Sequence, residues 1–179
     1  MKLAVPFLLL AAAAAICCGG ASLADSQSRT APQPVTRPAD VSRWVTLGTT
    51  LHMRSGDQHT PEEMRHVQIE PEAYERLLRD GAFPDGTQFA VTIHALKMDG
   101  AGDGALYAED AERALVLEIL DSHHPDGRRF YVYPPGTVSA QPLPPGNQCA
   151  VCHNAHGMRQ GTFTQFYPTI AAGHPHSAQ

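Results

Sequence analysis

The chain has 179 residues, and its 13 Lys and Arg against 18 Asp and Glu give a formal net charge of −5. Proteins that bind nucleic acids hold the phosphates with clustered Lys and Arg, so this charge balance argues against a nucleic-acid partner. The length fits one globular domain with short extensions at its ends.

Residues 1–24 have the pattern of a secretory signal peptide. A single Lys precedes an apolar run from Leu3 to Ile16, and small residues around Ala24 provide a cleavage site. The run is shorter than the roughly 20 apolar residues that a membrane-spanning helix needs. Lipidation at Cys17 or Cys18 is the alternative, although Ile16 stands where a lipoprotein signal has a small residue. We therefore expect cleavage near Ala24 and a periplasmic protein.

The rest of the chain divides into three parts. Residues 25–39 are rich in Ser, Thr, Pro and Gln, which predicts a flexible leader. Residues 40–173 have the length of one folded domain, and residues 174–179 would form a tail. Removing residues 1–24 takes away one Lys and no acid, so 12 basic and 18 acidic residues remain, a net charge of −6.

Apolar patterns within residues 40–173 predict strands separated by turns. The clearest helix is 72–80, because Pro71 stands at a helix start and Gly81 at a helix exit. The predicted strands are 46–53, 64–69, 88–96, 114–120 and 129–133, and further short helices are predicted at 41–44 and 164–171. We therefore predict an α+β fold with an antiparallel sheet of about five strands, short packing helices and a haem-bearing C-terminal helix.

The strand at 88–96 indicates which residues share a face of the sheet. Successive side chains alternate across a strand, so Phe89, Val91 and Ile93 would lie on one face, with Thr92 and His94 on the other. Residues 114–120 are nearly all apolar, which favours a central strand buried on both sides.

One motif, Cys149-Ala150-Val151-Cys152-His153, carries the chemistry. Without residues 1–24, Cys149 and Cys152 are the only cysteines of the chain. Two thiols three residues apart on a helical turn can reach the two vinyl groups on one porphyrin edge. The next residue then points its imidazole at the iron. The motif predicts one covalently bound c-type haem with His153 as the proximal ligand.

Two other kinds of site share the cysteine pair. A dithiol redox pair would open a helix directly after a strand, whereas this motif follows a Pro-rich segment at 134–146. A structural zinc site would need two more ligands at finger-like spacing, for which His156, His174 and His176 are the candidates. The predicted export favours haem over both, because c-type haem is attached outside the cytoplasm.

The second axial position of the iron decides the class of cytochrome. An electron carrier with two strong axial ligands would use a second His or Met. No Met lies in an apolar loop of the kind that small cytochromes use, and Met158 is close to His153 in sequence. Most His residues have the surroundings of surface turns, and His94 lies on a predicted strand. We expect an open sixth position, with a six-coordinate electron-transfer cytochrome as the alternative.

The sequence resembles the cytochrome P-460 family, which also contains the cytochrome c′-beta proteins. The likeness covers nearly all of residues 40–173. It is carried by the late CxxCH motif and by the segments 44–49, 71–74, 83–87 and 163–168, the last being Phe-Thr-Gln-Phe-Tyr-Pro. The resemblance implies a sheet-rich homodimer with one five-coordinate haem per chain, bound by Cys149, Cys152 and His153. A small redox protein would be a further partner.

The resemblance leaves the activity open between two classes. Members of the P-460 kind oxidise hydroxylamine with a lysine linked to the porphyrin edge, and the matching position here is Val91. Lys97 lies six residues along the strand, about 20 Å away, and would need a shift in register. The chain therefore resembles the c′-beta type, which binds nitric oxide or related small molecules. Hydroxylamine oxidation is the alternative.

Three residues are candidates for the open side of the haem. Arg65 matches the distal Arg of the family and could hydrogen-bond a nitrogenous ligand, although it could equally pair with Glu62 or Glu63 on the surface. Glu118 would correspond to a distal carboxylate that relays protons, unless Val116 takes that position. Phe89 is a candidate for the apolar lid of c′-beta members, or a residue of the core.

Overall fold

The computed structural model describes residues 33–57, 59–100, 104 and 106–171. The predicted signal peptide at 1–24 and the predicted tail at 174–179 lie outside the described residues. None of the described helices is both long and apolar enough to cross a membrane.

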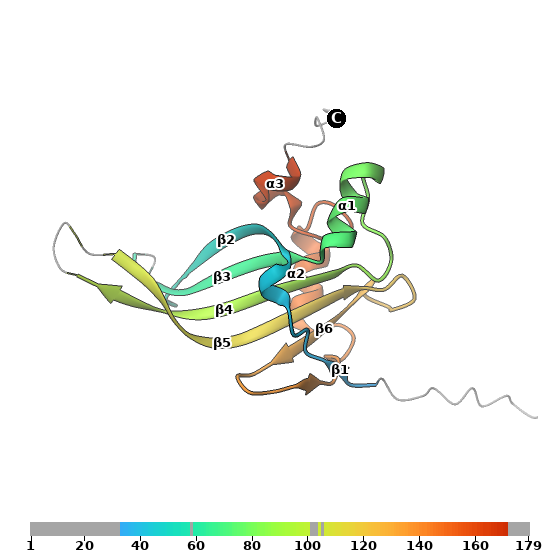
Figure 1. Ribbon diagram of the computed structural model, residues 1–179. Helices are drawn as coiled ribbons and strands as arrows, with labels where there is room; N and C mark the ends of the chain where they lie inside the picture. Colours follow the sequence, from blue (N-terminus) through green and yellow to red (C-terminus); the bar gives the residue numbers. More distant parts are fainter. Residues whose placement is uncertain (1–32, 58, 101–103, 105, 172–179) are drawn as a thin grey trace, which may run out of the picture. The chain divides into compact units, whose positions relative to one another are not determined.

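The described chain forms one five-stranded antiparallel sheet and one sheet of two short strands (Figure 1). The order in the large sheet is β2-β3-β4-β5-β6, so each strand pairs with its neighbour in sequence. Its strands are β2 (Val45–Met53), β3 (Pro61–Ile69), β4 (Gln88–Asp99), β5 (Leu106–Leu120) and β6 (Arg128–Tyr133). The predicted α+β class with about five antiparallel strands is confirmed.

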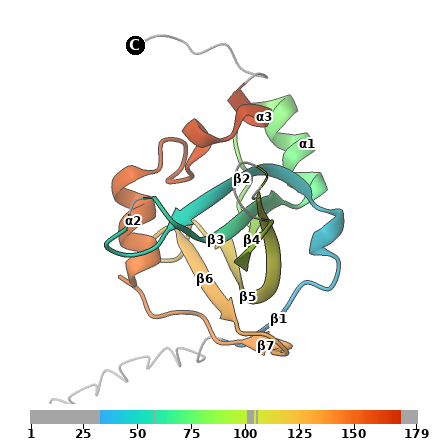
Figure 2. The same cartoon turned by 90° about the vertical axis from the view of Figure 1, so that its left-hand side faces the viewer.

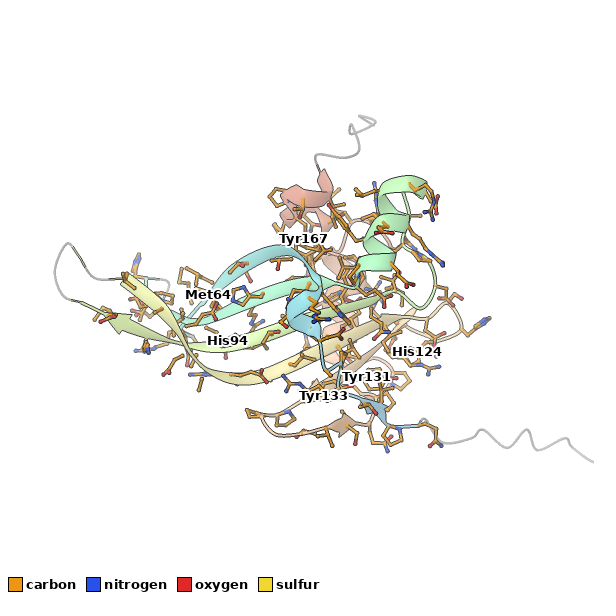
Figure 3. The ribbon with its side chains drawn as sticks, viewed as in Figure 1. Met64, His94, His124, Tyr131, Tyr133 and Tyr167 are labelled. Atoms are coloured by element: carbon orange, nitrogen blue, oxygen red, sulfur yellow. The ribbon has the colours of Figure 1, made fainter. Side chains whose placement is uncertain are left out.

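The large sheet buries a different apolar cluster on each face. Phe89 belongs to one cluster and its neighbour Ala90 to the other, as the alternation along β4 predicts. Figure 3 shows Tyr167 on one side of the sheet and Tyr131 with Tyr133 on the other. Strand β5 also contributes side chains to both clusters, so the central strand predicted at 114–120 is buried on both sides.

Helix α1 (Pro71–Asp80) packs on the face that carries Phe89. Pro71 begins the helix, and Gly81 ends it in the left-handed conformation with φ of 73°, its N–H donating to the Leu77 carbonyl at 2.8 Å. Ala73 and Leu77 point into the cluster. The predicted helix at 72–80 is therefore confirmed with its start and exit residues.

The C-terminal segment contains three short helices, α2 (Gln148–His156), η3 (Thr164–Phe166) and α3 (Pro168–Ala171). Figure 2 shows α2 beside the large sheet, where it packs on β6. The prediction of one continuous helix at 164–171 is wrong. Proline lacks an N–H donor and disfavours the helical conformation of the residue before it, so Pro168 leaves Tyr167 extended between η3 and α3.

The flexible leader predicted at 25–39 needs correction in its last part. Strand β1 (Val35–Thr36) pairs with β7 (Ser139–Ala140), and the Arg37 N–H donates to the Val138 carbonyl at 2.9 Å. Arg37 also forms an ion pair with Glu112 at 2.8 Å. Backbone pairing does not depend on apolar side chains, so a Ser- and Pro-rich composition does not exclude it. The folded domain thus begins before residue 40.

The two remaining differences concern strand β5 and the first helix. Strand β5 starts at Leu106, whereas the apolar run predicts a start at residue 114. Its additional residues pair with the exposed end of β4, as Ala108 does with Lys97. Because this part of the sheet is exposed, these residues do not show the apolar pattern on which the prediction relied. The predicted helix at 41–44 is a single turn, η1 (Val41–Arg43).

Candidate functional site

A cavity of about 560 Å³ lies between the large sheet and the C-terminal segment, and Cys149, Cys152 and His153 of the CxxCH motif line it. Cavities of a few hundred to a thousand cubic ångströms are the usual size for small molecules and cofactors. Its wall is lined by Thr50, His52, Arg65, Val67, Phe89, Val91, Ile93, Val116, Glu118, Phe130, Gln148, Cys149, Cys152, His153, Thr162, Phe163, Phe166 and Tyr167. The structure thus brings together all five predicted site residues.

The first turn of α2 places the two cysteines on one side of the helix. The Asn147 side chain caps the helix by accepting a hydrogen bond from the Ala150 N–H at 3.1 Å. Residues three apart on a helix lie on the same face, so Cys149 and Cys152 both reach the cavity. Both cysteines are free thiols and half-buried.

The environment of Cys149 differs from that of a catalytic dithiol. Burial is the main cause that raises the pKa of the Cys149 thiol. Reactive cysteines of redox pairs have lowered pKa values, so the raised pKa argues against that alternative. Within the described residues, no three His, Cys, Asp or Glu side chains are grouped to hold a metal ion. Two of the candidate zinc ligands, His174 and His176, lie outside the described residues.

Among the described residues, the polar contacts of the His153 imidazole all involve its ring nitrogen Nδ1. Its Nδ1 lies 3.1 Å from the Gly161 carbonyl oxygen, and the rings of Phe130 and Phe163 contact it edge-on with centroids 5.0 and 4.8 Å away. In the part of the chain that the structure describes, Nε2 has no hydrogen-bond partner. Metal-bound histidines use their second nitrogen for such an anchoring hydrogen bond. The arrangement therefore leaves Nε2 for an iron atom.

Glu118 lies beside the ring nitrogen Nδ1 of His153, whereas we expected it on the open side of the haem. Its carboxylate is 3.4 Å from His153 Nδ1, the ring nitrogen that faces away from a metal on Nε2. The side chain is 5% exposed and forms an ion pair with Arg128, which is 3% exposed. This contact favours a role for Glu118 beside His153 and does not support the distal proton relay predicted from the sequence.

Arg128 is a site residue that the sequence reasoning missed. Besides Glu118, its guanidinium donates to the Gly161 carbonyl at 3.0 Å and to the Gln160 carbonyl. A buried carboxylate requires a partner, and Arg128 follows Glu118 at the start of the next strand. The acid within an apolar strand was the signal that could have pointed to this pair.

Two glycines allow the loop after α2 to return to His153. Gly161 has φ of +68°, and an added Cβ would lie 2.0 Å from Arg128 Nη2. A Cβ on Gly157 would lie 2.2 Å from the Gly161 carbonyl carbon. Only glycine fits such contacts, so these two residues bring the Gly161 carbonyl to the imidazole.

Arg65 lines the cavity from β3, as expected for a residue on the open side. Its guanidinium also forms an ion pair with Glu63 at 2.9 Å, so the surface pair considered for Arg65 is present, while the side chain borders the cavity. On the neighbouring strand, His52 lines the cavity and was missed from the sequence, although it shares a face with Thr50. Burial, followed by the Arg65 charge, holds the pKa of His52 below its usual range.

Position 91 contributes an apolar side chain to the cavity. Val91 pairs with Val67 in a regular stretch of register between β3 and β4, and both residues line the wall. Lys97 is exposed near the end of β4 and does not line the cavity. Phe89 is 2% exposed and contacts Phe83 edge-on at 5.1 Å, while it also reaches the wall, so it serves the core and the cavity together.

A second cavity, of about 680 Å³, lies on the opposite face of the sheet. It is lined by residues of the other strand parity, among them His66, Gln68, Thr92 and His94. None of the predicted site residues reaches it. His94 therefore faces away from the CxxCH motif.

The residues around the CxxCH motif fit a haem. The cavity offers two thiols, an imidazole with an unpaired Nε2, and a wall of apolar side chains. Thr162 lines it with a buried hydroxyl that has no hydrogen-bond partner among the described residues, which leaves a donor for a bound group. None of the curated proteins compared matches the chain. The model of the family described as cytochrome P-460 matches residues 38–164. The chain therefore belongs to the cytochrome P-460 family and is a haem c cytochrome.

Proposed function

We propose that the protein is an exported cytochrome with one haem, covalently bound through Cys149 and Cys152, whose iron binds nitric oxide or a related small nitrogen species. The main support is the apolar wall of the cavity, to which Val67, Val91 and Ile93 contribute. Small uncharged ligands suit such an apolar wall. A haem bound there would supply an iron atom with a coordination position for them.

His153 and Arg65 have different tasks in this proposal. His153 binds the iron through Nε2, since its Nδ1 is engaged with the Gly161 carbonyl. Arg65 donates a hydrogen bond to the bound ligand, and its ion pair with Glu63 orients the guanidinium. An Arg65→Ala variant should release nitric oxide faster than the parent protein.

Hydroxylamine oxidation of the P-460 kind is the first rival. It requires the lysine linked to the porphyrin edge, and among the described residues no lysine lines the cavity. Steady-state turnover with hydroxylamine and a chemical oxidant tests this rival. Turnover that depends on Arg65 would favour the enzyme over the binding protein.

A six-coordinate electron carrier is the second rival, and His52 is the residue that favours it. Of the described His and Met residues, only His52 and His153 line the cavity. The lowered pKa favours the neutral form of the His52 imidazole, which is the form that binds metals. If ferric holoprotein is low-spin and His52→Ala makes it high-spin, His52 is the sixth ligand and the open-site proposal fails.

The cellular setting follows from the leader sequence and from the family resemblance. We infer export to the periplasm, where a small redox protein would reduce the iron, and we infer a homodimer. Fractionation of the producing cells tests the location, and sedimentation analysis of the holoprotein tests the dimer. A protein retained in the cytoplasm would lack covalent haem and contradict the proposal.

The direct test is a titration of ferrous holoprotein with nitric oxide. The haem should stay with the protein in acidified acetone, and the ferrous absorption should change on addition of a stoichiometric amount of nitric oxide. His66→Ala is a matched control, because His66 lies on the opposite face of the same strand as Arg65. Holoprotein whose ferrous spectrum does not respond to nitric oxide would overturn the proposal.

A further inference from the structure

We propose that the buried Glu118–Arg128 ion pair controls how strongly His153 donates electron density to the haem iron, with Arg128 as a positioning residue. This inference rests on the proposed role of His153 as the iron ligand. It assigns a function to an ion pair that contacts Nδ1 of His153 and takes no part in binding the small ligand.

Three groups surround Nδ1 of His153. The Gly161 carbonyl oxygen lies at 3.1 Å, Arg128 Nη1 at 3.3 Å and Glu118 Oε1 at 3.4 Å. With Nε2 on iron, Nδ1 carries the proton, so it cannot accept from Arg128. The choice of acceptor is therefore between the Gly161 carbonyl and the Glu118 carboxylate, and the shorter contact is to the carbonyl.

Arg128 decides this choice through its own hydrogen bonds. Its Nη1 donates to the same Glu118 oxygen that faces His153, so that oxygen is already engaged. Nη1 and Nη2 also hold the Gly161 and Gln160 carbonyls. The guanidinium thus neutralises the carboxylate and fixes the neutral carbonyl in place as the acceptor for Nδ1–H.

The identity of the acceptor changes the iron. Hydrogen bonds to an ionised acceptor are stronger than those to a neutral one, so a carboxylate draws the Nδ1 proton more strongly than a carbonyl does. A stronger pull raises the basicity of the imidazole and its donation to the metal, which tunes the reduction potential. With Arg128 in place, His153 should be a moderate donor.

A purely structural ion pair is the competing interpretation. Removing either partner would leave a buried charge unpaired and would destabilise the fold whatever the pair does for the haem. Loss of stability therefore does not test the inference. The iron–histidine stretching frequency does, because a structural role would not move it in folded holoprotein, and the reduction potential then reports the accompanying change in charge near the iron.

The experiment compares Arg128→Gln, Glu118→Gln and the double variant as holoproteins. Spectroelectrochemistry gives the reduction potential, and resonance Raman of the ferrous form gives the iron–histidine stretch. In Arg128→Gln the released carboxylate should accept Nδ1–H, which lowers the potential and raises the stretching frequency. In Glu118→Gln the uncompensated guanidinium should raise the potential and leave the frequency near that of the parent protein.

The double variant and a neighbouring arginine supply the controls. Removing both charges should return the potential toward the parent value, since neither charge is then unbalanced. Arg129→Gln is the matched control, because Arg129 follows Arg128 but forms its ion pair with Asp121 at 41% side-chain exposure. It should change neither readout. If Arg128→Gln does not take up haem, Arg128→Lys replaces it, because Lys keeps the positive charge but lacks the two NH2 groups of the guanidinium. Arg128→Lys should shift the reduction potential and the stretching frequency in the direction expected for Arg128→Gln, but by less.

Two results would overturn the inference. One is an unchanged potential and stretching frequency in folded Arg128 variants, and the other is a shift of the same sign in Arg128→Gln and Glu118→Gln. A failure of the proposed function looks different. In that case the parent holoprotein would show no iron–histidine stretch, or His153→Ala would leave the spectrum as it was.

Discussion

Val91 lies directly opposite Val67 on the neighbouring strands β4 and β3, and both side chains line the cavity that contains the CxxCH motif. The register between these strands is regular from Glu63 with Ala95 to Ile69 with Phe89. Position 91 therefore faces the cavity, and it presents two methyl groups at the position where the resemblance would place the lysine of the hydroxylamine oxidisers.

The first prediction concerns the covalent attachment of the haem at this wall. Tryptic digestion of holoprotein should give one haem-bearing peptide, which contains Cys149 and Cys152, because no lysine of the described residues lines the cavity. Lys97→Ala should leave the haem spectrum unchanged. Mass spectrometry that finds a second haem-linked peptide containing Lys97 would contradict this prediction.

The second prediction concerns the two thioether bonds. Cys149→Ser and Cys152→Ser should each leave haem attached by one bond, and the double variant should lose its haem in acidified acetone. Helix α2 should persist in all three, since the Asn147 cap and buried Ala150 are unchanged. Circular dichroism checks the helix, and haem that stays attached in the double variant would exclude these cysteines.

The third prediction concerns the loop that returns to His153. Gly161→Ala should lower the free energy of unfolding by about 1–3 kcal/mol, because it adds strain at a positive φ and a clash with Arg128. Gly136→Ala is the control, since Gly136 has φ of +78° but no atom within 4 Å of an added Cβ. The difference in free energy of unfolding between the two variants, measured by urea denaturation, gives the cost of the clash with Arg128. Equal losses of stability would mean that the loop shifts to avoid the clash.

The fourth prediction concerns pH. Burial, and then the Arg65 charge, lower the pKa of His52 in the folded protein, so folding disfavours its protonated form. His52 thus stabilises the fold above its unfolded pKa of about 6.5, and this contribution is lost as the pH falls through the folded value. The thermal unfolding temperature should fall more between pH 7 and pH 5 in the parent protein than in His52→Gln. Equal decreases in unfolding temperature would mean that other groups, and not His52, cause the loss of stability.

Local signals in the sequence predict the parts of the fold that depend on few residues. Pro71 and Gly81 fix the ends of α1 because one suits the first helical turn and the other the left-handed exit. The alternation along β4 predicts which side chains reach the cavity. The CxxCH spacing predicts the short helix α2 for the same reason, since one turn of helix brings both thiols to one face.

Features that depend on pairing over long distances could not be predicted in this way. The pairing of Val35 with Ala140 joins segments more than a hundred residues apart, and two strands of two residues each are too short to show an alternating side-chain pattern. The alternation along β5 places both Val116 and Glu118 at the cavity. It does not say whether Glu118 faces the open side or His153. The position of Arg128 decides that, and Arg128 comes from another strand.

The spin state of the isolated ferric holoprotein tests the open sixth position most directly. Absorption and electron paramagnetic resonance spectra at neutral pH should show a high-spin ferric iron, which on reduction and addition of nitric oxide becomes a ferrous nitrosyl species. A low-spin ferric spectrum with His or Met as the sixth ligand, unaffected by nitric oxide, would contradict the proposed function.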